Sequence, residues 1–115
     1  MKIVKNVAAQ GEMLIRRVAS FEGGSKPFEA EGNHFILAHS ETGHHHVIDR
    51  TKVRVTEQVK APTGMAILQL IVDEPAVIEH LRGHDTHEPL MLSEGLWEVR
   101  LQREYTPGGY RRVAD

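Results

Sequence analysis

Histidine is the residue type in this sequence best suited to do chemistry, because the chain has eight histidines and no cysteine. Five of them lie in the stretch His34–Asp49, and the other three follow by His87. A neutral imidazole is a common ligand for zinc, iron and nickel, and it can also act as a general acid or base near neutral pH. The histidines therefore predict a metal site. A metal-free acid–base pair is an alternative, although no spacing selects which two histidines would form it.

The stretch His34–Asp49 is expected to form a β-hairpin around the turn-forming tetrapeptide Ser-Glu-Thr-Gly. A tight connection places His39 opposite His44, and side chains alternate between the two faces of a strand. His39, His44 and His46 then share one face, while His45 lies on the other. The apolar base beneath the three imidazoles consists of Phe35, Leu37 and Ile48.

Two later histidines, His84 and His87, and Glu88 lie in a glycine- and aspartate-containing loop that we expect to fold over the hairpin and supply a fourth ligand or a partner that orients a ligand. The predicted ligands of a divalent transition metal (zinc, iron or nickel) are therefore His39, His44, His46, His84 and His87. If the site catalyses a reaction on a small-molecule ligand, we expect hydrolysis by a metal-activated water or oxygen chemistry at iron.

The alternative interpretation is a non-enzymatic binding or assembly module, in which the histidines pack structurally or respond to pH. Protonation of all eight histidines raises the formal charge from −2 to +6, each adding one charge, so the surface field is sensitive to mild acid. The motifs of zinc proteases (His-Glu-x-x-His), phosphate-binding loops and serine hydrolases (Gly-x-Ser-x-Gly) are all absent from the sequence.

The histidines lie in or between short apolar-rich runs that are separated by turn-forming residues. These runs predict an all-β single domain over residues 1–115, a small antiparallel barrel or sandwich of about seven to eight strands. The segment Ala76–Leu81 favours a strand, and a short helix near residues 74–82 is the alternative. Residues Ser20–Gly32 are expected to be a loop, and regular structure is expected to end after Tyr105. The expected strands are Lys2–Val7, paired with Glu12–Val18, then His34–His39, His44–Asp49, Lys52–Val59, Met65–Val72, Pro89–Leu92 and Leu96–Tyr105.

Composition narrows the cellular setting and the partners. The N-terminus has no apolar run of signal-peptide length, and Met65–Val72 is too short to span a membrane, so we expect a cytoplasmic protein with no membrane partner. The near-balanced charge argues against nucleic acid as a partner. Open sheet edges and the C-terminal tail are candidates for homo-oligomer contacts.

The C-terminal stretch HDTHEPLMLSEGLWEVRLQREYTPGGYRRVAD resembles the C-terminal part of small uncharacterised proteins from bacteria and their phages or mobile elements. That resemblance implies no activity. The placement of histidines on neighbouring strands is also similar to that of cupins, small β-barrels whose metal ligands come from adjacent strands. The His-x-His-then-Glu spacing of the glycine-framed cupin motif is missing here.

Overall fold

The computed structural model describes the backbone of residues 1–39, 45–80, 88–106 and 109–112, and the side chains of these residues as far as Leu101. Within those ranges every regular element is a β-strand, so the all-β prediction is confirmed. The described residues accordingly contain no helix long and apolar enough to cross a membrane.

The strands, in chain order, are β1 Lys2–Ile3, β2 Val7–Gln10, β3 Met13–Arg17, β4 Ser25–Pro27, β5 His34–Ala38, β6 His46–Asp49, β7 Val53–Gln58, β8 Met65–Val72, β9 Ala76–His80, β10 Leu90–Leu92, β11 Gly95–Thr106 and β12 Gly109–Arg112.

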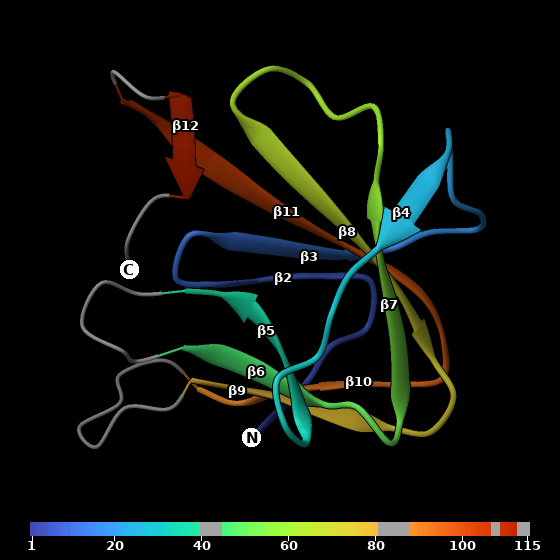
Figure 1. Cartoon of the computed structure of the whole chain (residues 1–115). Coiled ribbons are helices and arrows are strands. Elements are labelled where there is room, and N and C mark those ends of the chain that lie inside the picture. The colour runs from blue at the N-terminus through green and yellow to red at the C-terminus, as the bar shows by residue number, and fades with distance from the viewer. Residues whose placement is uncertain (40–44, 81–87, 107–108, 113–115) are drawn as a thin grey trace.

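The strands form two sheets (Figure 1). Sheet I has five strands in the order β1-β10-β9-β6-β5. Sheet II has seven, in the order β2-β3-β11-β8-β7-β4, with β12 paired to β11. The arrangement is a sandwich of two open sheets and not a closed barrel, which settles the choice that the sequence left open.

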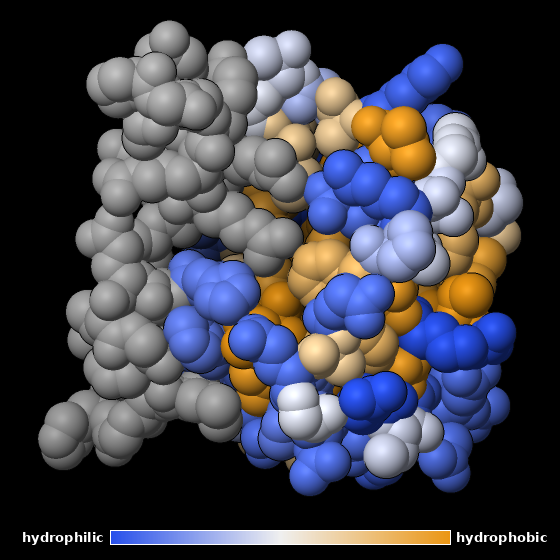
Figure 2. Space-filling model, viewed as in Figure 1, coloured by the Kyte–Doolittle hydropathy of each residue, from blue (hydrophilic) through white to orange (hydrophobic). Residues whose placement is uncertain are grey.

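The core lies between the two sheets and is built by alternation. Along β11, Trp97, Val99 and Leu101 are buried in the core, as their spacing predicts, while Glu98 and Arg100 face the outer side. On the face of the molecule shown in Figure 2, hydrophilic and apolar residues are interspersed over the described part of the surface. The largest fully buried apolar side chains are Trp97, Met13, Ile15, Leu37, Ile48, Leu68, Leu70, Ile78 and Leu92.

Trp97 is held in this core by a hydrogen bond and a cation–π contact as well as by packing. Its Nε1 donates a hydrogen bond of 2.8 Å to the carbonyl oxygen of Ser93. The guanidinium carbon of Arg17 lies 4.5 Å from the indole centroid, a cation–π contact. Gly95 makes room for that arginine, because its φ is +136° and a Cβ at this position would lie 2.7 Å from Arg17 Nη1.

Four details of the sequence prediction are corrected. The described residues form twelve strands, more than the seven to eight expected. The N-terminal run divides: β1 pairs in parallel with β10 of sheet I, and only β2 forms the expected hairpin with β3. The expected loop Ser20–Gly32 contains the short edge strand β4. The chain after Thr106 returns as β12 against β11.

Two other strand assignments are confirmed. Met65–Val72 is central in sheet II, between β11 and β7. Ala76–His80 is a strand, so the alternative helix is wrong, while Leu81 lies outside the described residues.

Replacing Trp97 with alanine is expected to lower the free energy of unfolding by about 3–5 kcal/mol, because a large buried side chain is deleted from a packed core. Leu14→Ala, on the outer face of the adjacent strand β3, is the control, and we expect it to change stability by less than about 1 kcal/mol. Urea denaturation followed by circular dichroism measures both. Similar costs for the two variants would contradict the assignment of faces.

Candidate functional site

Strands β5 and β6 pair as the predicted hairpin, in the expected register from His34 to Ile36 and out of that register afterwards. The pairing of β5 with β6 shifts between Ile36 and Ala38, so that Ala38 lies opposite His46, where the predicted register has Leu37. An extra residue in one strand of this kind reverses the side chains that follow it. His39 is exposed, and its ring contacts that of His45, with centroids 4.8 Å apart. The expected shared face of His39 and His46 is therefore wrong.

His46 faces the interior of the sandwich together with a histidine from the neighbouring strand. His46 on β6 and His80 on β9 are register partners in sheet I, and their side chains point to the same face because paired residues share a face. Their relative exposures are 0% and 5%. The two rings are stacked, with centroids 4.3 Å apart and planes inclined by 16°. Two imidazoles from adjacent strands therefore meet in a buried position.

Gln10 of sheet II holds the ring of His46 in one orientation. The Gln10 Nε2 donates hydrogen bonds to the backbone carbonyl oxygens of Ile78 (3.3 Å) and Glu88 (3.0 Å). This fixes Gln10 Oε1, an acceptor, at 2.7 Å from His46 Nδ1. The ring must then carry a proton on Nδ1, because a flipped amide would set Oε1 against two carbonyl oxygens. In the neutral ring, the lone pair that a metal can use is consequently on Nε2.

The remaining predicted ligands cannot be placed. His44, His84 and His87 lie outside the described residues. The described chain nevertheless lies at the buried cluster beside both segments. His46 follows residues 40–44 closely, His80 directly precedes residues 81–87, and the carbonyl oxygen of Glu88, which follows them, accepts a hydrogen bond from Gln10. Among the described residues, no group of three or more histidine, cysteine or acidic side chains is arranged to hold a metal ion.

Sequence reasoning missed Gln10 and assigned no ligand role to His80. The signal for His80 was present, because it continues the alternation of Ala76 and Ile78 and therefore belongs to the core face of its strand. Gln10 continues the inward alternation of Ala8 in the same way. Its partners are Ile78 and Glu88, which are 68 and 78 residues away, so its role depends on how the two sheets face each other.

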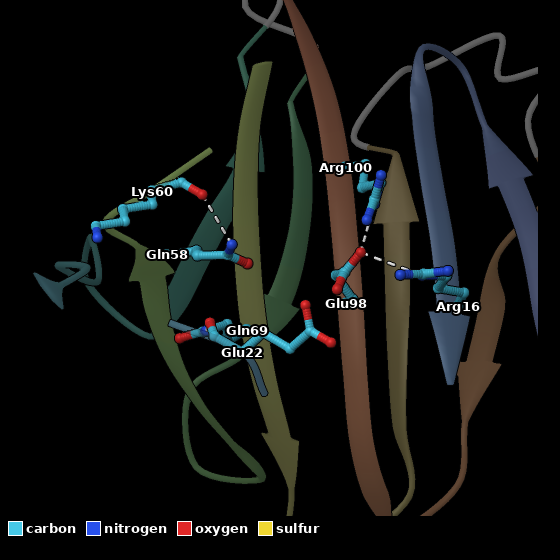
Figure 3. A network of polar contacts seen from close by, with 7 residues as sticks. All are labelled: Arg16, Glu22, Gln58, Lys60, Gln69, Glu98 and Arg100. Atoms are coloured by element: carbon cyan, nitrogen blue, oxygen red, sulfur yellow. Dashed lines mark hydrogen bonds and ion pairs between the residues drawn. The ribbon is translucent and has the colours of Figure 1, made fainter. Parts of the chain in front are cut away.

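A second polar cluster lies on the outer face of sheet II (Figure 3). Thr56, Gln69, Glu98 and Arg16 are successive register partners across β7, β8, β11 and β3. Thr56 Oγ1 donates to Gln69 Oε1 at 2.9 Å, and Arg16 Nε donates to Glu98 Oε1 at 3.1 Å. Arg100 Nε also donates to Glu98 Oε1. The carboxylate of Glu98, which is largely buried, therefore contacts two arginines, Arg16 from the row and Arg100 from its own strand.

The ionisation of Glu98 reflects two opposing effects. Burial raises the pKa of the Glu98 carboxyl, but hydrogen bonds from Arg100 and Arg16, with the charges of both arginines, outweigh burial and hold the pKa below its ordinary value. Glu98 is therefore an anion over the whole physiological range.

Gln10→Met tests the contribution of the Gln10 hydrogen bonds to stability, and NMR of the wild-type protein tests the tautomer of His46. The change removes the acceptor for Nδ1–H and the donor for two carbonyl groups, so we expect the free energy of unfolding to fall by about 1–3 kcal/mol. Long-range ¹H–¹⁵N spectra of the wild-type protein should show His46 protonated at Nδ1. A ring protonated only at Nε2 would contradict the assignment.

Glu98→Gln tests the arginine-held carboxylate through acid stability. A lowered folded pKa means that the unfolded chain binds the proton more readily, so the ionic contribution is fully present above the ordinary value of 4.5 and is lost as pH falls toward the lower folded value. The stability difference between wild type and Glu98→Gln, from urea midpoints at several pH values, should therefore shrink on acidification below 4.5. Glu94→Gln, at an exposed position, is the control. A difference independent of pH would contradict the account.

Comparison with known proteins identifies a family and no individual relative. No curated protein and no solved structure matches the chain. The model of one family, described as a domain of unknown function (DUF8820), matches residues 9–102, a segment that includes both polar clusters. Because the match covers most of its length, the chain belongs to the DUF8820 family.

Proposed function

We propose that this protein binds a divalent transition metal (zinc, iron or nickel) at the buried histidine cluster, with His46 and His80 as ligands. The observation that carries the proposal is the hydrogen bond between Gln10 Oε1 and His46 Nδ1, at 2.7 Å. A metal-binding histidine usually donates its other ring N–H to an oxygen acceptor, which fixes the ring and leaves the second nitrogen for the metal.

Burial supports a specific site over adventitious binding. His46 and His80 are nearly inaccessible, whereas solvated histidines on a hairpin bind metal without any prepared geometry. Burying two imidazoles and an amide is costly unless their polar atoms have partners. The three hydrogen bonds of Gln10 offset part of that cost, and a metal ion bound by both rings would offset more of it.

A metal site needs more ligands than these two. Structural zinc sites use four protein ligands and catalytic sites commonly use three. We propose that they come from His44, His84 and His87, which belong to the two segments that adjoin the cluster in the sequence. His39, one of the ligands predicted from the sequence, is not part of this proposal because its ring contacts His45 on the other side of the hairpin. Hydrolase or oxygenase activity, which requires an open position on the metal, stays a prediction.

The test compares the metal affinity of variants at His46, the first residue of β6, and at His45, which directly precedes this strand. Protein is purified without metal-affinity chromatography, its metal content is measured, and zinc binding is titrated by calorimetry after chelation. His46→Ala and His80→Ala should each weaken zinc binding at least about tenfold, and Gln10→Met should weaken it about tenfold or more through loss of the ring's anchor. His45→Ala, the matched control, should leave the affinity unchanged.

Melting temperatures in chelator separate lost folding from lost binding, since each variant must be folded for its titration to count. Equal effects of His45→Ala and His46→Ala would mean adventitious binding. Absence of binding by the folded wild type would overturn the proposal in favour of the alternative function, a metal-free binding or assembly module.

A further inference from the structure

Arg16 and Arg100, the two arginines beside Glu98, each form a hydrogen bond through only one guanidinium nitrogen in the described structure. Arg54, in the same sheet, uses two. Arg54 is engaged by two of its nitrogens, since Nε and Nη2 both donate to Asp73 (3.0 and 2.9 Å). Arg16 and Arg100 each contact Glu98 through Nε. Within the described structure, the terminal Nη groups of these two arginines make no hydrogen bond. A guanidinium held by Nε presents its Nη donors in a fixed direction.

These arginines line a cavity of about 280 Å³ on the outer face of sheet II. The cavity lies between β11 and the segment that follows β3, which contributes Ser20 and Glu22, and Gln58 of β7 also lines it. In Figure 3, Gln58 lies on one side of β8 and the Arg16–Glu98–Arg100 group on the other. The cavity is of a size for a small polar molecule and is lined by hydrogen-bonding groups.

The charges around the cavity favour an anion near the arginines. Glu98 is 12% exposed by its side chain and is already shared by both arginines, which are 46% and 32% exposed. One positive charge of this group is therefore uncompensated. Glu22 is the other carboxylate that lines the cavity, and it is exposed and forms no side-chain hydrogen bond in the described structure. The negative charge of Glu22 repels an anionic ligand, but no hydrogen bond in the described structure holds the Glu22 side chain in the cavity.

We propose that this cavity binds a small oxyanion, the carboxylate or phosphate group of a small molecule, on the terminal guanidinium nitrogens of Arg16 and Arg100. Glu98 acts as a positioning residue, because it orients both guanidinium groups through Nε and leaves their terminal nitrogens for the ligand. Ser20 and Gln58 supply further hydrogen-bonding groups at the wall of the cavity. The site lies on the opposite side of sheet II from the buried histidines and does not depend on metal binding.

The test is an NMR titration of ¹⁵N-labelled protein with two probes, inorganic phosphate and acetate, at an ionic strength held constant with sodium chloride. The Nε–H signals of Arg16 and Arg100 and the side-chain amide of Gln58 should shift in a saturable way with at least one probe. Comparison of the two affinities distinguishes a phosphate from a carboxylate ligand.

Four variants make the test specific. Arg16→Gln and Arg100→Gln should each weaken binding about tenfold, as expected for loss of charge-assisted hydrogen bonds. Arg54→Gln removes a charge of the same kind from the same sheet and should change the affinity by less than about twofold. Glu22→Gln changes only an exposed residue, so it keeps the fold, and it should strengthen binding.

Several results would overturn the proposal. Equal weakening by Arg54→Gln and Arg16→Gln would indicate non-specific attraction of anions. Shifts that do not saturate with either probe would mean that no site exists. If Arg16→Gln or Arg100→Gln fails to fold, Glu22→Gln decides, because unchanged or weaker binding by that variant excludes an anion in this cavity.

Discussion

The hydrogen bonds of Gln10 are the constraint on which the rest of the interior depends, because they join the two sheets through the core. Gln10 belongs to β2 of sheet II, whereas all three of its partners, Ile78, Glu88 and His46, lie in sheet I or in the segment leading to β10. A buried amide without partners is strongly destabilising. The two sheets must therefore face each other in the one arrangement that satisfies it, which apolar packing alone does not specify.

The same constraint determines what His46 can do. Apolar side chains that face the interior are interchangeable within limits of volume, but a buried imidazole requires a defined partner for each nitrogen. Gln10 provides that partner for Nδ1, and His80 covers the ring at 4.3 Å. The fold thus keeps polar groups inside a small sandwich, on the inner strands β6 and β9 of sheet I, beside a hydrophobic core that contains large side chains such as Trp97.

How much the sequence predicts follows from the range of the interactions involved. Alternation is local, so the faces of β11 and the central position of β8 were predictable from the sequence. The hairpin of β5 and β6 and its register from His34 to Ile36 were also predictable. The irregularity between Ile36 and Ala38 was not, because it buries Leu37 and Ala38 together in the core, against the alternation of a regular strand.

Neither polar cluster could be located from spacing. Gln10 and His46 lie 36 residues apart, and Arg16 and Glu98 lie 82 apart. Their meeting depends on the strand order of the finished sheets, in particular on β11 lying between β3 and β8. The sequence predicts histidine-based metal binding, which stays a prediction, and the buried pair of His46 and His80 is the place at which we propose it.

Anomalous diffraction at a metal absorption edge tests the metal proposal most directly, with crystals of protein purified without an affinity column. We expect an anomalous peak at about 2.0–2.1 Å from Nε2 of His46, the distance of a metal–imidazole bond, with a nitrogen of His80 also in its coordination shell. A peak confined to His39 and His45 on the exposed side of the hairpin would contradict this account, as would a metal-free cluster in crystals soaked with zinc.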